Sequence, residues 1–100
     1  MTSAMTPSTK PKVLIVDDDH YTRTLLDRLI GKTADVRLAA DGAEARKHFA
    51  AEDFNLVLMD QRLPADNGIE LLREFRARRP RLVGILMTGY ADVREAVAAV

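Results

Sequence analysis

Four side chains that offer oxygen ligands each follow a short apolar run closely: Asp17, Asp18, Asp60 and Thr88. Carboxylate and hydroxyl oxygens are hard ligands, which suit Mg²⁺ or, as an alternative, Mn²⁺. Mg²⁺ in proteins keeps coordination positions that phosphate oxygens can take, so this donor set is typical of phosphoryl transfer. Asp60 is the best candidate nucleophile, because carboxylates can form aspartyl phosphates.

These side chains can act together only if the chain delivers them to one edge of a sheet. The apolar runs at 13–16, 56–59 and 83–87 predict strands buried on both faces, as in a parallel sheet covered by helices. Ligand crevices in such sheets lie at the carboxyl ends of the strands. Two carboxylates about 4 Å apart repel by about 4 kcal/mol at an effective dielectric of about 20. The predicted cluster therefore favours a bound cation or a protonated acid.

Strands and helices alternate along the chain. Strands are predicted at 12–17, 35–39, 54–60 and 82–88, and helices at 20–32, 43–52, 68–79 and from 92 onward. This order predicts an α/β fold with right-handed βαβ units and a doubly wound parallel sheet. In the first helix, the apolar residues expected to face the sheet are Leu25, Leu26, Leu29 and Ile30. Asp19 is expected to cap that helix, and 61–67 is predicted to be a loop.

Composition narrows the class of protein. The 100 residues suffice for one small domain, and the net charge of zero gives no overall field for nucleic acid or an anionic membrane. The chain has no cysteine, which excludes disulfides and thiolate metal sites. No apolar stretch approaches the roughly 20 residues that cross a bilayer. We expect residues 1–11 to be a flexible leader and the protein to be cytoplasmic.

The predicted sheet reaches only its fourth strand, and the sequence ends within the next helix. We therefore interpret residues 12–100 as a domain truncated after its fourth βα unit. The fourth strand would then be an unprotected edge, which can pair with a second copy.

At the acidic positions the sequence resembles the receiver domain of two-component response regulators. The segment 13–19 resembles the family's acidic first strand, 58–64 its phosphoacceptor strand and loop, and 86–90 its switch-hydroxyl strand. The resemblance implies a flavodoxin-like (receiver) topology. It also implies that this chain lacks the fifth strand and helix, with the lysine that the family carries on that strand.

The resemblance also implies roles for individual residues in a regulatory switch rather than an enzyme. Asp60 would accept a phosphoryl group from the phosphohistidine of a sensor histidine kinase or phosphotransfer protein. Asp18 and Asp60 would bind Mg²⁺ directly, Asp17 mostly through water, and the backbone carbonyl of Arg62 would be a further ligand. Thr88 would turn toward the phosphoryl oxygens and report phosphorylation.

Two further points follow from the resemblance. The segment 87–97 is similar to receivers fused to AAA+ transcription activators, which implies control of transcription through an output domain absent from this chain. DNA would be contacted only by that domain, a homodimer is an option, and no membrane contact is implied. Asp66 stands where an apolar residue is commoner in the family, and we interpret it as a surface substitution.

Two other functions remain open at this point. One is a receiver-like association module that is not phosphorylated. The other is a haloacid-dehalogenase-like phosphatase, whose Asp-x-Asp motif Asp17 and Asp19 could form. The phosphatase is the weaker alternative, because Tyr21 stands where that family has Thr or Val and Asp60 has no role in it.

Overall fold

A computed structural model describes residues 10–88 of the chain. Its elements in chain order are β1 (Lys12–Val16), α2 (His20–Ile30), β2 (Asp35–Ala39), α3 (Gly42–Ala51), β3 (Leu56–Asp60), β4 (Arg62–Leu63), β5 (Asp66–Asn67), α4 (Gly68–Arg78) and β6 (Val83–Met87). The predicted strands and helices within this range are present, with ends that differ by up to two residues.

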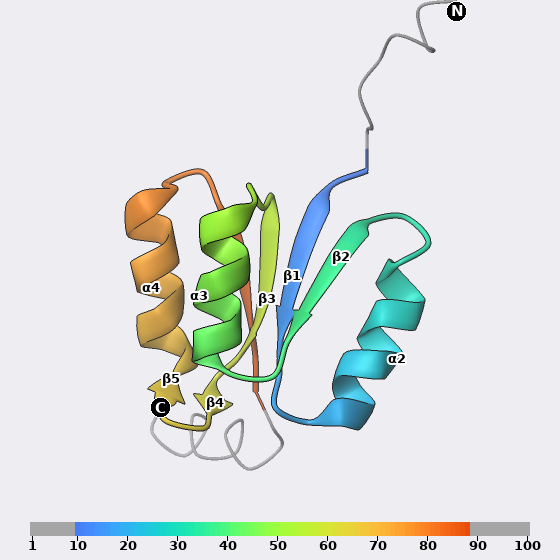
Figure 1. Cartoon of the computed structure of the whole chain (residues 1–100), viewed down its shortest axis with the longest axis horizontal. Helices are drawn as coiled ribbons and strands as arrows, with labels where there is room; N and C mark the ends of the chain where they lie inside the picture. The colour runs from blue at the N-terminus through green and yellow to red at the C-terminus, as the bar shows by residue number, and fades with distance from the viewer. Residues whose placement is uncertain (1–9, 89–100) are drawn as a thin grey trace, which may run out of the picture.

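The four longer strands form one parallel sheet in the order β2-β1-β3-β6. Figure 1 shows α2 on one side of this sheet and α3 and α4 on the other. The doubly wound, flavodoxin-like arrangement predicted from the sequence is therefore confirmed. The carboxyl ends of the strands lie together at the lower edge in Figure 1.

The core lies on both faces of the central strands, because consecutive residues of β1 and β3 point to opposite faces and are apolar at 13–16 and 56–59. Val13 and Ile15 belong to the cluster that packs against α2, whereas Leu14 and Val16 belong to the cluster under α3 and α4. On the second face, the rings of Phe49 from α3 and Phe75 from α4 stack with centroids 4.1 Å apart. This packing fixes the sheet edge at which the polar side chains emerge.

The predicted inner face of the first helix is partly wrong. Leu26 and Ile30 of α2 pack against the sheet, but Leu25 is 44% exposed and Leu29 is 65% exposed. The physical reason is that a helix on one half of a sheet face contacts it through a narrow stripe. The other two leucines lie beyond that stripe.

The predicted loop at 61–67 contains a small hairpin. Arg62 pairs with Asn67 and Leu63 pairs with Asp66 in an antiparallel arrangement. Ala65, at the turn, has a φ of 61°. The side chain of Leu63 is buried in the core under α3 and α4. A two-residue strand carries no apolar run, so the sequence pattern gave no sign of it.

Several expectations fall on segments outside residues 10–88, namely most of the leader at 1–11 and the helix from 92 onward. Within the described range, no helix has the length and apolar character needed to cross a membrane.

Candidate functional site

Backbone hydrogen bonds hold the ends of neighbouring strands level with one another. The amide of Asp17 donates to the carbonyl oxygen of Ala39 at 3.0 Å, one residue beyond β1. The amide of Gln61 donates to the carbonyl oxygen of Met87 at 3.0 Å, one residue beyond β3. The side chains that follow β1, β3 and β6 consequently emerge at the same edge.

Three carboxylates meet at this edge. Asp17, Asp18 and Asp60 each offer an oxygen, and these oxygens all lie within 4.8 Å of one another. The side chain of Asp17 is buried, that of Asp18 is exposed and that of Asp60 is half-buried. They line a cavity of about 280 Å³. Its lining residues are Asp17, Asp18, Asp19, Thr22, Asp60, Met87 and Thr88.

The first strand end is shaped by local hydrogen bonds. Asp17 Oδ1 accepts from the amide of Asp19 at 2.8 Å, and Arg23 Nη1 donates to the carbonyl oxygen of Asp17 at 2.7 Å. Asp19 is the N-cap of α2, and its Oδ2 accepts from the amide of Thr22 at 3.0 Å. The hydrogen bond from the Thr22 hydroxyl, followed by that from the Thr22 amide, lowers the pKa of Asp19. The predicted capping role of Asp19 is confirmed.

Asp60 differs electrostatically from an ordinary surface aspartate. Burial, followed by the charges of Asp17 and Asp18, raises the pKa of Asp60 from 3.8 to about 6. The amide of Arg62 donates to Asp60 Oδ1 at 3.2 Å and opposes that rise. A carboxylate kept ionised here at neutral pH is repelled by its neighbours, and a cation would relieve the repulsion.

The two ends of the segment that follows Asp60, at Gln61 and Gly68, lie close together. The amide of Gly68 donates to the carbonyl oxygen of Gln61 at 2.9 Å. A Cβ at Gly68 would lie 2.0 Å from the carbonyl oxygen of Asp60, so no larger residue fits without moving the backbone. Gly68 thus allows α4 to begin directly against the strand end that carries Asp60.

The donor set fits a hard divalent cation such as Mg²⁺. It consists of three carboxylates within reach of one ion, and none of the residues that line the cavity is a histidine or cysteine. Oxygen ligands without nitrogen or sulfur favour Mg²⁺ or Mn²⁺ over zinc.

The structure brings together four of the predicted site residues, namely Asp17, Asp18, Asp60 and Thr88. Arg62 begins the hairpin, where its backbone contacts the Asp60 carboxylate. Sequence reasoning did not assign Thr22 to the cavity. The sequence signal that could have indicated Thr22 is its position three residues after the N-cap Asp19. At that position the N-cap side chain accepts a hydrogen bond from the backbone amide.

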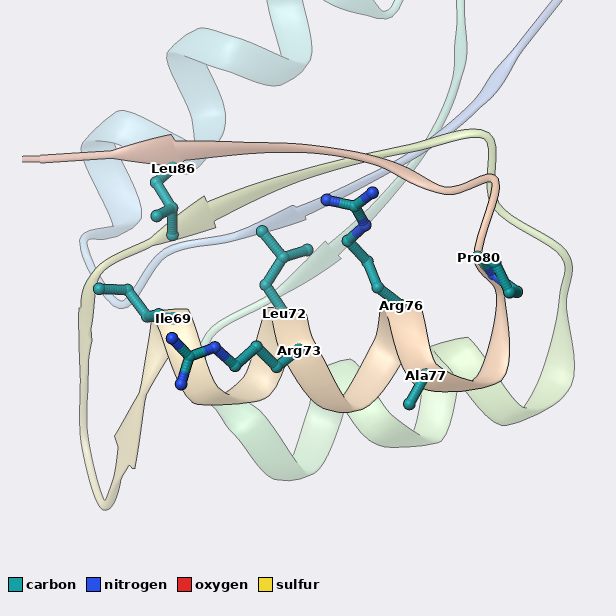
Figure 2. Close-up of a pocket in the computed structure, with 7 residues that line it drawn as sticks. All are labelled: Ile69, Leu72, Arg73, Arg76, Ala77, Pro80 and Leu86. Carbon is teal, nitrogen blue, oxygen red and sulfur yellow. The ribbon is translucent and has the colours of Figure 1, made fainter.

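A different cavity, of about 460 Å³, lies between α4 and β6. Figure 2 shows Leu72 of α4 reaching toward the sheet and Leu86 of β6 pointing back toward the helix. Its lining residues are Ile69, Leu72, Arg73, Arg76, Ala77, Pro80 and Leu86. None of these lining residues is an acid or a nucleophile, in contrast to the cavity at the acidic edge.

Comparison with known proteins identifies related sequences and structures. The sequence model of the response regulator receiver domain matches residues 13–100. Response regulator protein PilR of Pseudomonas aeruginosa is 36% identical over 91 residues, which cover 90% of this chain and 20% of PilR. The DNA-binding transcriptional regulator NtrC of Escherichia coli is 35% identical over 88 residues, which cover 87% of this chain and 19% of NtrC. The chain thus spans about a fifth of the length of these two relatives.

A solved structure agrees with the sequence matches. The response regulator receiver domain protein (CheY-like) from Methanospirillum hungatei has a TM-score of 0.79 and 33% identity to this chain. The alignment covers 89% of this chain and 72% of that chain.

Proposed function

The chain belongs to the response regulator receiver domain family of two-component signalling, and from that premise we propose that it accepts a phosphoryl group on Asp60. The donor is the phosphohistidine of a sensor histidine kinase or phosphotransfer protein. The chain acts as a regulatory switch, which promotes only its own phosphorylation and dephosphorylation.

The reaction is a phosphoryl transfer between two side chains. An oxygen of the Asp60 carboxylate attacks the phosphorus of the phosphohistidine. The P–N bond breaks as the new P–O bond forms, and the imidazole leaves with the electron pair and takes a proton from solvent. The product is an aspartyl phosphate. The amide of Arg62, 3.2 Å from Asp60 Oδ1, orients the carboxylate for this attack.

Asp18 and Asp60 are the direct Mg²⁺ ligands in this proposal, with Asp17 acting mostly through water and the backbone carbonyl of Arg62 as a further ligand. When bound, the ion would offset the repulsion among the acids and stabilise charge on the phosphoryl oxygens. Thr88 lines the same cavity, which supports its role as the hydroxyl that turns toward the phosphoryl group.

One observation carries the proposal. Three carboxylates from two strand ends lie within 4.8 Å, in a cavity they share with a hydroxyl from a third strand end. Such a cluster is costly unless a cation or a proton compensates it. The phosphatase alternative loses support, because the carboxylate of Asp19 caps α2.

The output of the switch is proposed from the relatives. NtrC is named a DNA-binding transcriptional regulator, which supports control of transcription through a further domain, as in receivers fused to AAA+ transcription activators. Contact with DNA would occur only through such a domain. We place the protein in the cytoplasm, where a histidine kinase would present its phosphohistidine.

The test is phosphorylation of the full-length protein by acetyl phosphate with Mg²⁺, followed by intact mass. We expect the mass to rise by one phosphoryl group. Asp60→Asn should abolish the rise, whereas Asp53→Asn, an exposed acid outside the cavity, should leave it unchanged. Labelling that persists at the wild-type level in Asp60→Asn would refute the proposal.

A further inference from the structure

The hairpin of residues 62–67, which follows Asp60, is tied to α3 by an ion pair that the phosphoryl-transfer chemistry does not use. Arg46 Nη2 of α3 donates to Asp66 Oδ1 of β5 at 3.1 Å. The two residues are 20 positions apart in the chain. Asp66 was interpreted from the sequence as a surface substitution; its side chain is 21% exposed and takes part in this ion pair.

The guanidinium of Arg46 is itself held in place by α4. Its Nε donates to Glu74 Oε2 at 2.9 Å and its Nη2 to Glu74 Oε1 at 3.1 Å. A two-point contact of this kind fixes the plane of the guanidinium as well as its position. We call Arg46, Asp66 and Glu74 the Arg46 clamp.

The structure also makes room for Asp66 at the start of α3. A Cβ at Gly42 would lie 2.1 Å from Asp66 Oδ2 and 2.6 Å from its Cγ. A larger residue at position 42 would displace the Asp66 carboxylate from its place between the first turn of α3 and Arg46. The fit of Gly42 is independent of the ion pair, and both point to one position for the hairpin.

Asp66 is linked to the Asp60 carboxylate indirectly, through the pairing of the hairpin and the amide of Arg62. Asp66 pairs with Leu63 in the hairpin, and the neighbouring pair is Arg62 with Asn67. The amide of Arg62 then donates to Asp60 Oδ1 at 3.2 Å. A shift of the hairpin would therefore move both the Arg62 amide and the Arg62 carbonyl.

We propose that the Arg46 clamp is a positioning device for the acidic site, which holds the hairpin so that the Arg62 backbone can orient Asp60 and contribute a metal ligand. Arg46 does not touch the reacting atoms, so it is a positioning residue and not a catalytic one. This inference rests on the proposed function, because it concerns the Mg²⁺ and phosphoryl site at Asp60.

The expected effect is on the site more than on global stability. Exposed ion pairs contribute little to folding, and the side chain of Arg46 is 44% exposed. Groups outside the ligand shell that orient the ligands typically change metal affinity about 10–100-fold when they are removed. We expect Arg46→Ala to weaken Mg²⁺ binding by about tenfold, at the lower end of that range.

The experiment measures Mg²⁺ affinity of the full-length protein by isothermal titration calorimetry, together with the rate of phosphorylation by acetyl phosphate. Arg46→Ala and Asp66→Asn should each raise the Mg²⁺ dissociation constant and slow labelling. The double variant should match the single ones, because both remove one contact. Arg46→Lys should be intermediate, since a lysine keeps the charge but not the two-point contact.

The matched control is Arg73→Ala, which removes the exposed ion pair with Glu70 on α4 and leaves the hairpin untouched. It should keep wild-type affinity. Backbone amide shifts of Arg62 and Asn67, measured without Mg²⁺, should move in Arg46→Ala and stay in Arg73→Ala. This readout separates a displaced hairpin from a general loss of stability.

The outcomes separate the two proposals. Normal Mg²⁺ binding and labelling in wild type and in Arg46→Ala would overturn the Arg46 clamp alone. Equal weakening in Arg46→Ala and Arg73→Ala would also overturn it, because the effect would not be specific to the hairpin. Absence of Mg²⁺ binding and labelling in wild type would overturn the proposed function and the clamp with it.

Discussion

Asp60 stands out among the acids because its surroundings oppose its charge. Burial and the carboxylates of Asp17 and Asp18 raise its pKa to about 6, close to the pH at which a cell works. By contrast, the hydrogen bonds from Thr22 lower the pKa of Asp19, which keeps that acid ionised as a helix cap. Neighbouring aspartates thus have different tasks that their local contacts explain.

A pH dependence of stability follows from this difference at Asp60. The folded-state pKa lies above the unfolded value of 3.8, so folding favours the protonated form. The stability that this group contributes is fully present below about pH 3.8 and is lost as the pH rises through about 6. Each pKa unit corresponds to about 1.4 kcal/mol.

The measurement compares Asp60→Asn with wild type by denaturant unfolding without Mg²⁺. The variant should gain about 1–3 kcal/mol over wild type at about pH 8, and this gain should vanish at about pH 4. Mg²⁺ should reduce the gain at about pH 8, because the ion stabilises only the ionised site. Glu70→Gln, away from the cavity, should keep the wild-type response to Mg²⁺, because it leaves the three carboxylates intact. A gain in Asp60→Asn that does not depend on pH would contradict the account.

At the scale of elements, the site depends on how strands end and how the next segment begins. β3 ends at Asp60, and only seven residues separate it from Gly68, where α4 begins. Within them the hairpin turns the chain back while Leu63 stays buried in the core. The strand end, the hairpin and the start of the helix therefore behave as one unit.

Gly68→Ala tests this unit. Its Cβ would lie 2.0 Å from the backbone oxygen of Asp60, and overpacking of this kind costs about 1–3 kcal/mol. Denaturant unfolding should show that loss. Gly84→Ala is the matched control, because the nearest neighbours of its Cβ are side-chain atoms of Leu72, which borders the cavity between α4 and β6, and not backbone atoms. A loss at Gly68→Ala no greater than at Gly84→Ala would contradict the account.

The sequence predicted the strands and the edge where they end, because a strand buried on both faces leaves a continuous apolar run. The same reasoning predicted that Asp17, Asp18 and Asp60 would meet. It could not choose which leucines of α2 face the sheet, since Leu25 and Leu26 differ only in their angle around the helix. It also missed the contact of Arg46 with Asp66, because a pair of charges distant in sequence leaves no periodic pattern.

At the scale of the whole molecule, the described part of the chain separates structural and chemical roles. Helices cover the two faces of the sheet, while the carboxyl ends of the strands carry the acids. The family assignment explains this division, and the relatives PilR and NtrC are about five times longer than the matched segment. The matched segment is therefore only a small part of each of these two relatives.

The most direct test of the central claim is chemical mapping of the phosphorylated residue. The full-length protein is treated with acetyl phosphate and Mg²⁺ and then with borohydride, which reduces an aspartyl phosphate to homoserine, and peptides are sequenced by mass spectrometry. We predict homoserine at position 60, dependent on Mg²⁺ and on the phosphodonor. A phosphoryl group found on Thr88 or on another acid, with Asp60 unmodified, would contradict the account.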